Sequence, residues 1–259
     1  MTIKTLTISI IQAELHWHDA SKNQQQFAAT IASIDHECDL IVLPEMFTTG
    51  FTMDASNNAE AMDGSSVTWM QETALTANSS VCGSLIIEEN GHYFNRFIQV
   101  SPDGDLQSYD KRHLFRLADE QKYFSPGTQK ITIELNGFRL CPMVCYDLRF
   151  PVWSRNRDDY DVLLYVANWP SRRQFAWDTL LRARAIENLS YVVGVNRNGT
   201  DGNDLPYTGG SCIVDYLGAD LANLQDRNGV ATAVLDLQKL NEFRESFAFD
   251  KDADTFTVG

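Results

Sequence analysis

The chain has 259 residues, of which 44% are hydrophobic and 22% are charged, and its formal net charge is −14 at pH 7. A soluble chain of this length and composition can bury a substantial core. Its acidic surface would repel phosphate backbones and anionic lipids, so we expect neither nucleic acid nor a membrane as a partner. A small anionic substrate would be repelled too, and its site must therefore supply a local cation.

The N-terminal segment and the cysteines favour a cytoplasmic location. Residues 1–10 alternate between apolar and polar types, as a strand does, and lack the long apolar region of a signal peptide. No apolar run is long enough to span a bilayer. No CxxC pair and no His/Cys cluster has the spacing of zinc ligands. The five cysteines are odd in number and widely spaced, which favours reduced thiols: Cys38, Cys82, Cys141, Cys145 and Cys212.

Strands and helices alternate along the first half of the chain. Periodicity predicts strands at 4–11, 39–43, 81–87, 92–100 and 105–110, and helices at 21–34 and 66–78. Ser21 is a candidate N-cap for the first helix. The apolar run at 39–43 is typical of a strand that is buried on both faces. The polar segment 111–127 ends in Ser-Pro-Gly and is expected to be a structured loop.

The second half continues the alternation without a Pro/Ser-rich linker, so we expect one domain over residues 1–259. A hairpin turning at Asn136-Gly137 is predicted between strands 130–135 and 138–144. Further strands are predicted at 161–166, 191–196, 209–215 and 230–236, and helices at 151–157, 174–189 and 237–246. The pattern indicates an α/β fold with two mixed sheets packed face to face and helices as outer layers.

Four unusual segments each begin where a predicted strand ends, which is where ligands gather in α/β proteins. In the first segment, Glu45 directly follows the apolar strand and is flanked by Pro44 and Met46-Phe47. Burial would raise the pKa of this carboxyl and suit it to act as a general base and acid. The alternative is an ordinary solvated loop glutamate. In the second segment, Lys111 ends a hairpin strand, although Asp110 and Arg112 beside it are also compatible with a charged surface turn.

In the third segment, Cys145 ends a strand and precedes a helix that starts at Pro151. A thiol at such an elbow is exposed enough to attack, and nearby backbone N–H groups can lower its pKa and hold an oxyanion. Cys141 lies inside the same strand and is expected to be core. All five histidines precede Cys145, which excludes a papain-like order of nucleophile and base. Only His113 lies near these segments, so a carboxylate, with Glu45 leading, is the expected base.

The fourth segment follows the strand at 161–166. Asn168 could line a pocket there, and Arg172 or Arg173 could hold a substrate carboxylate, unless they form a solvated basic pair. Arg149 is a further candidate for the carboxylate, with a structural ion pair to Asp147 or another nearby acid as its alternative. Three aromatic side chains near these segments are expected either to shape a small pocket or to join the core: Phe47, Tyr146 and Trp169.

Together the segments resemble the nitrilase superfamily of carbon–nitrogen hydrolases. Its pattern is a glutamate just after a strand, a lysine in a Lys-x-His-Leu-Phe-like stretch and a cysteine in a Cys-Tyr-Asp-Leu-Arg-Phe-like stretch, matched here by Glu45, Lys111 and Cys145. The family carries a second glutamate downstream of the lysine, and Glu120 matches that position. The resemblance runs from the first strand to about residue 245, including the stretches 168–170 and 182–188.

Within the superfamily, the stretches 109–115, 145–154 and 167–170 resemble the omega-amidases (2-oxoglutaramate amidases), especially their bacterial members. The resemblance implies a four-layer α-β-β-α sandwich, a homodimer and a thioester intermediate on Cys145. Glu45 would be the base, assisted by Glu120, while Lys111 and the backbone N–H of Tyr146 would hold the oxyanion. The implied substrate is a small 2-oxo dicarboxylic acid monoamide such as 2-oxoglutaramate, whose carboxylate binds an arginine. No metal or organic cofactor is needed for this chemistry.

Two alternatives remain open at this point. One is another amidase of the superfamily, acting on deaminated glutathione or on N-carbamoyl compounds. The other is a non-catalytic scaffold that has kept the fold, against which the complete set of Glu45, Lys111 and Cys145 argues.

Overall fold

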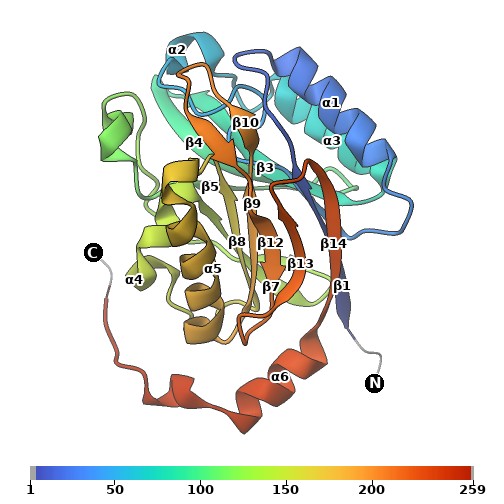
Figure 1. Ribbon diagram of the computed structural model, residues 1–259, viewed down its shortest axis with the longest axis vertical. Helices are drawn as coiled ribbons and strands as arrows, with labels where there is room; N and C mark the ends of the chain where they lie inside the picture. Colours follow the sequence, from blue (N-terminus) through green and yellow to red (C-terminus); the bar gives the residue numbers. More distant parts are fainter. Residues whose placement is uncertain (1–3, 258–259) are drawn as a thin grey trace.

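Two six-stranded sheets form the centre of the molecule (Figure 1). In the computed structural model, which describes residues 4–257, the strand orders are β14-β1-β2-β3-β4-β5 and β13-β12-β9-β8-β7-β6. Each sheet is mixed, because parallel pairs in its middle are flanked by antiparallel pairs at its edges. Helices cover the outer faces of both sheets. The prediction of an α-β-β-α sandwich of two mixed sheets is therefore confirmed.

The first sheet follows the predicted strands within a few residues. It contains β1 (Thr5–Gln12), β2 (Leu40–Val42), β3 (Ser80–Glu89), β4 (His92–Val100), β5 (Leu106–Asp110) and β14 (Gly229–Asp236). In β1, Leu6, Ile8 and Ile10 point into the core between the sheets, whereas Ile11 packs with the outer helices. These helices are α1 (Ala20–Ala32) and α3 (Ser65–Ala77), which lie side by side. Side-chain alternation along a strand thus builds two cores from one sheet.

The second sheet contains β6 (Ile133–Leu135), β7 (Phe138–Val144), β8 (Val162–Ala167), β9 (Tyr191–Asn196), β12 (Ser211–Val214) and β13 (Asp220–Gln225). Helix α5 (Gln174–Asn188) covers its outer face and contacts β9 and β12. Trp177 and Leu181 of α5 are fully buried against the sheet. The central strands β8 and β9 are buried along their whole length, as their continuous apolar runs require. Two further helices are α4 (Pro151–Ser154) and α6 (Leu237–Ser246).

Some local features differ from the expectations. Helix α1 is capped by Asp19, whose side chain accepts a hydrogen bond from the Lys22 N–H, so the prediction of Ser21 as N-cap was wrong. Four short or polar elements were not predicted: α2 (Ala55–Asn58), β10 (Asn198–Thr200), β11 (Pro206–Thr208) and β13. Among the described residues, no helix is both long and apolar enough to cross a membrane.

Candidate active site

The segments after β2, β5, β7 and β8 converge at one end of the sandwich. Glu45 follows β2, Lys111 follows β5, Cys145 follows β7 and Asn168 follows β8. Two of these strands belong to each sheet, so the group is assembled across the sandwich. The structure thus brings together four side chains that the sequence places directly after predicted strands.

A buried cluster of opposite charges occupies this end. Lys111 Nζ donates to Glu45 Oε1 at 3.1 Å and to both carboxylate oxygens of Glu120 at 3.0 Å. All three side chains are fully buried. Glu120 lies in a short 3₁₀ turn, Glu120–Lys122, inside the predicted structured loop. Buried charges need such pairing because desolvating each of them is costly. The loop thus delivers a second carboxylate to the lysine.

Two asparagines fix the orientation of Glu45. Asn95 Nδ2 donates to Glu45 Oε1 at 2.7 Å, and the backbone N–H of Asn168 donates to Oε2 at 2.7 Å. The Asn168 side chain also donates to the Glu45 carbonyl at 2.5 Å. Ser84 in turn donates to Asn95 Oδ1 at 2.8 Å. Asn95 was not predicted from the sequence, because its only signal is a polar residue in the middle of β4.

Cys145 sits on a strained elbow between β7 and a 3₁₀ turn, Cys145–Arg149. Its φ of 44° lies in the left-handed region, which non-glycine residues rarely occupy. Such strain is characteristic of functional positions. The side chain is half-buried, whereas the other four cysteines are buried. The Sγ atom lies 3.8 Å from the Asn168 carbonyl oxygen, with which it makes a weak hydrogen bond. The elbow therefore presents this thiol alone to the space above the cluster.

Burial and charge set the protonation states in this cluster. Desolvation raises the pKa of the Cys145 thiol well above its usual range, and the nearby Glu45 carboxylate raises it further by charge and hydrogen bonding, while Lys111 opposes both. Desolvation alone would lower the pKa of Lys111, but the carboxylates of Glu120 and Glu45 outweigh it and raise that pKa. Desolvation also raises the pKa of Glu120, against the effect of Lys111. These directions favour a neutral resting thiol that needs a base, beside a charged lysine, and they run against the expectation that backbone N–H groups lower the pKa of Cys145.

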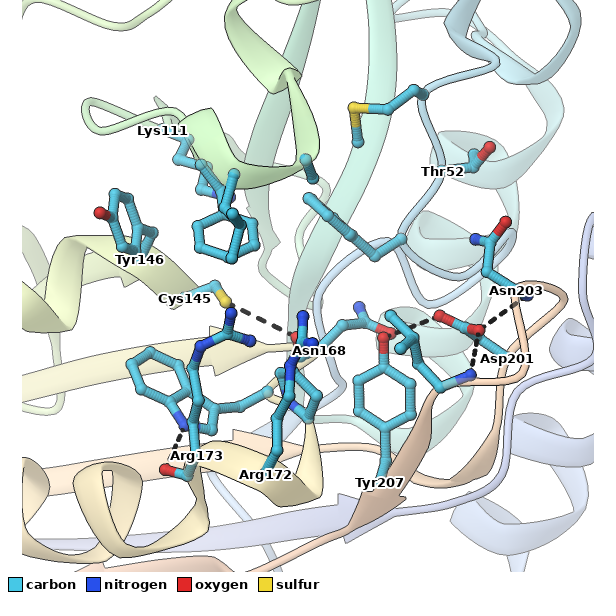
Figure 2. A pocket seen from close by; sticks show the side chains of 18 of the residues that line it. Thr52, Lys111, Cys145, Tyr146, Asn168, Arg172, Arg173, Asp201, Asn203 and Tyr207 are labelled. Atoms are coloured by element: carbon cyan, nitrogen blue, oxygen red, sulfur yellow. Dashed lines mark hydrogen bonds between the residues drawn. The ribbon is translucent and has the colours of Figure 1, made fainter.

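A pocket of about 480 Å³ opens above Cys145 and Lys111 (Figure 2). This volume suits a small organic ligand. Its walls include all but one of the residues predicted to bind substrate: Tyr146, Arg149, Asn168, Trp169, Arg172 and Arg173. Figure 2 shows Arg172 and Arg173 reaching toward the side of the pocket that holds Cys145.

The three arginines form a cationic wall. Arg149 lies over the ring of Trp169 at 4.8 Å, and Arg173 lies over the ring of Phe115 at 5.1 Å. Within residues 4–257, none of Arg149, Arg172 and Arg173 forms an ion pair with an acid. Desolvation lowers the pKa of Arg173, and the charges of Arg172 and Arg149 lower it further. An anion in the pocket would relieve this repulsion.

The opposite wall was missed in the sequence analysis. The hairpin β10–β11 carries Tyr207, whose hydroxyl donates to Asp201 at 2.9 Å. Asp201 also accepts the backbone N–H groups of Asn203 and Leu205 at 2.8 and 3.0 Å. These residues line the pocket facing the arginines (Figure 2). No periodicity marks this hairpin, because its strands have only three residues each.

Two sequence-based interpretations need revision. Phe47 does not line the pocket: it is fully buried and packs against Phe27 and Trp69, with ring centroids 5.8 and 5.7 Å away, so its assignment to the substrate site was wrong. His113, the alternative base, directs its Nδ1 to Asp147 at 2.8 Å. Asp147 therefore pairs with this histidine, and the alternative of an ion pair with Arg149 is not seen among the described ion pairs.

Comparisons with known proteins identify the family of this chain. The profile of the carbon-nitrogen hydrolase family matches residues 7–245. The omega-amidase YafV of Escherichia coli K12 is 44% identical to the chain, and the match covers 98% of each. A 2-oxoglutaramate amidase of Bacillus subtilis is 34% identical, over 93% of this chain and 94% of the relative.

A solved structure extends the comparison to the fold. XC1258 from Xanthomonas campestris, described as a CN-hydrolase superfamily protein with an arsenic adduct in the active site, has a TM-score of 0.96 to this chain. The two are 42% identical, and the match covers 100% of both chains. The chain belongs to the carbon-nitrogen hydrolase family, within the nitrilase superfamily, whose members act on carbon–nitrogen bonds other than peptide bonds.

Proposed function

We propose that this protein is an omega-amidase that hydrolyses 2-oxoglutaramate to 2-oxoglutarate and ammonia. The observation that carries the proposal is a single pocket lined by a half-buried thiol, by Lys111 of the buried Glu45–Lys111–Glu120 cluster and by three arginines without an acidic partner among the described residues. The thiol and the buried cluster suit attack on an amide, and the arginines suit a substrate that carries a carboxylate. The 44% identity to omega-amidase YafV supports the same assignment.

Acylation begins with proton transfer from the Cys145 thiol to Glu45. The thiolate attacks the amide carbon, and the electron pair of the C=O bond moves onto oxygen. Lys111 and the backbone N–H of Tyr146 stabilise this oxyanion, each such donor being worth about 3 kcal/mol. When the intermediate collapses, the C–N bond breaks and Glu45 returns its proton to the departing ammonia. A thioester remains on Cys145.

Deacylation repeats these steps with water as the nucleophile. Glu45 removes a proton from water, the hydroxide adds to the thioester carbon, and the C–S bond breaks to release the acid. The thiolate recovers the proton from Glu45. Glu120 supports both halves by holding Lys111 through two hydrogen bonds of 3.0 Å. No step requires a metal, and within the described residues no cluster of His, Cys, Asp and Glu is arranged to bind one.

The arginine wall anchors the carboxylate of the substrate. Arg173 has a buried Nη1 atom that lacks a hydrogen-bond partner, which a bound carboxylate can satisfy. We expect Arg173→Leu to raise KM for 2-oxoglutaramate roughly 10- to 100-fold, the loss of one charge-assisted hydrogen bond. Steady-state kinetics would measure this, with an uncharged aliphatic amide as the control substrate. An equal loss on the uncharged amide would assign Arg173 a general structural role instead.

A substrate panel tests the proposed reaction. Ammonia release would be measured from 2-oxoglutaramate, succinamate, an N-carbamoyl amino acid and deaminated glutathione, with the Cys145→Ala protein as blank. We expect the highest kcat/KM for 2-oxoglutaramate. A preference for the N-carbamoyl compound or for deaminated glutathione would replace the omega-amidase assignment with the corresponding alternative.

We also propose that residues 1–259 act as a single domain in a cytoplasmic homodimer. Phe175 and Ile186 on α5 are 84% and 48% exposed, which is unusual for large apolar side chains and supports a partner surface. All five cysteines are free, which supports a reducing compartment. Sedimentation velocity on the full chain would show a species of twice the monomer mass, and a monomer at micromolar concentration would contradict the dimer.

A further inference from the structure

One buried carboxylate outside the proposed reaction joins the two segments that carry the oxyanion donors. Asp147 is fully buried two residues after Cys145. Its Oδ1 accepts the backbone N–H of His113 at 2.9 Å and His113 Nδ1 at 2.8 Å. Its Oδ2 accepts the Tyr109 hydroxyl at 2.8 Å and the backbone N–H of Val144 at 3.0 Å. Four donors thus occupy one carboxylate.

These donors come from opposite sheets of the sandwich. Tyr109 belongs to β5 of the first sheet, and His113 lies just beyond it, so the two bracket Lys111. Val144 ends β7 of the second sheet, and together with Asp147 it brackets Cys145 and Tyr146. The two oxyanion donors, Lys111 Nζ and the Tyr146 N–H, therefore stand on segments that are joined by this carboxylate.

The surroundings hold the junction rigid. Trp153 Nε1 donates to the Tyr109 hydroxyl at 3.0 Å, which leaves the hydroxyl proton for Asp147. The His113 ring stacks on Phe150, with centroids 3.7 Å apart. Because a carboxylate only accepts, His113 must carry its proton on Nδ1. The Val144 contact also fixes the backbone immediately before the strained Cys145.

We propose that Asp147 is a positioning residue that sets the separation of Lys111 and the Tyr146 N–H, with His113 and Tyr109 as its partners. This inference rests on the proposed function in taking these two groups as the oxyanion donors. Asp147 is fully buried and does not line the pocket. It acts by holding the turn at Cys145, which follows a strand of the second sheet, at a fixed distance from Lys111, which follows a strand of the first sheet.

Asp147→Asn is a sharp test because no flip of the amide satisfies all donors. If the asparagine NH₂ group replaces Oδ2, it faces the Val144 N–H, and if it replaces Oδ1, it faces the His113 N–H. In either orientation one hydrogen bond to the backbone is lost, while the side-chain volume is kept. We expect kcat to fall about 10²-fold, the effect of a misplacement near 1 Å. Iodoacetamide should label Cys145 about tenfold more slowly, equivalent to one unit of pKa, because the thiolate loses part of its stabilisation by Lys111.

Asp161→Asn is the matched control. Asp161 is also buried and accepts four hydrogen bonds, three from Arg139 and one from Arg244. It lies at the start of β8, away from the pocket. Its substitution should lower Tm while leaving both the labelling rate of Cys145 and kcat unchanged. An Asp147→Asn protein whose Cys145 labels as fast as that of Asp161→Asn would overturn the inference.

Should Asp147→Asn fail to fold, His113 provides a second test. Its side chain is 24% exposed, so substitution is better tolerated. His113→Leu removes the donor and should slow labelling of Cys145, whereas His113→Asn retains an N–H donor and should restore it. Equal labelling of the two variants would overturn the proposal. Labelling needs no substrate, so it tests the positioning role separately from the proposed reaction. If the wild-type protein hydrolysed none of the amides, the proposed reaction would be rejected. Slow labelling of Cys145 in the variants would still uphold the positioning role.

Discussion

Replacing Cys145 with serine or alanine is expected to abolish amide hydrolysis without unfolding the protein. The thioester route requires the sulfur, and loss of an enzyme nucleophile typically costs 10⁴-fold or more, on the order of 10⁶ in the best-studied case. The folded state should tolerate the change because the thiol makes one weak hydrogen bond, to the Asn168 carbonyl at 3.8 Å. Ammonia release and a thermal melt on the same samples would measure both effects.

Cys141 is the matched control for this experiment. It lies four residues earlier in β7 and is fully buried. Its thiol is closed off from solvent, whereas that of Cys145 is half-buried and lines the pocket, so Cys141 should react with iodoacetamide far more slowly than Cys145. Cys141→Ala should keep its activity and lose about 1 kcal/mol of stability through the small cavity. If Cys145→Ala kept activity near that of the Cys141→Ala protein, the nucleophile would have to be sought elsewhere.

Glu45→Gln is expected to lower kcat for amides by several orders of magnitude. General acid–base catalysis contributes about 10²- to 10⁴-fold per transfer, and Glu45 serves both the thiol and the departing ammonia. The burial of Cys145 and the Glu45 charge both raise the pKa of the thiol, so the neutral thiol needs a base at pH 7. Without that base, the residual rate should rise with pH as solvent hydroxide forms the thiolate. Steady-state rates between pH 6 and pH 9 would measure this.

An ester of the same acid separates the two roles of Glu45. An activated ester with a phenolate leaving group departs without a proton, so Glu45→Gln should lose less rate on the ester than on the amide. Asn95 and the Asn168 N–H, which contact the carboxylate at 2.7 Å, remain in the variant. An equal loss on both substrates would indicate that the substitution disturbs the pocket rather than the proton transfer to nitrogen.

The regular parts of the fold were predictable because their physical signals are local. Alternation placed β1 and β4, and the continuous apolar runs placed β8 and β9. The N-cap of α1 was placed two residues late, since Asp19 and Ser21 are both good caps and only the three-dimensional path of the chain selects between them. The strands β10 and β11 have three residues each, too few to show a period.

The candidate site was predictable where it lies at strand ends. Glu45, Lys111 and Cys145 each directly follow a predicted strand, and the structure joins them across the two sheets. Glu120 lies in a loop without periodicity, so only the family resemblance pointed to it. Phe47 was assigned wrongly because an aromatic residue next to a catalytic segment can face either the pocket or the core. Asn95 and Tyr207 were missed because their roles arise from contacts with residues distant in the sequence.

The thioester on Cys145 is the central claim, and mass spectrometry of the quenched enzyme tests it most directly. The wild-type protein would be mixed with 2-oxoglutaramate, quenched in acid within milliseconds and digested to locate any adduct. We predict the added mass of one 2-oxoglutaryl group on Cys145 and none on Cys38, Cys82, Cys141 or Cys212. Steady turnover without any adduct, or an adduct on another residue, would contradict the account.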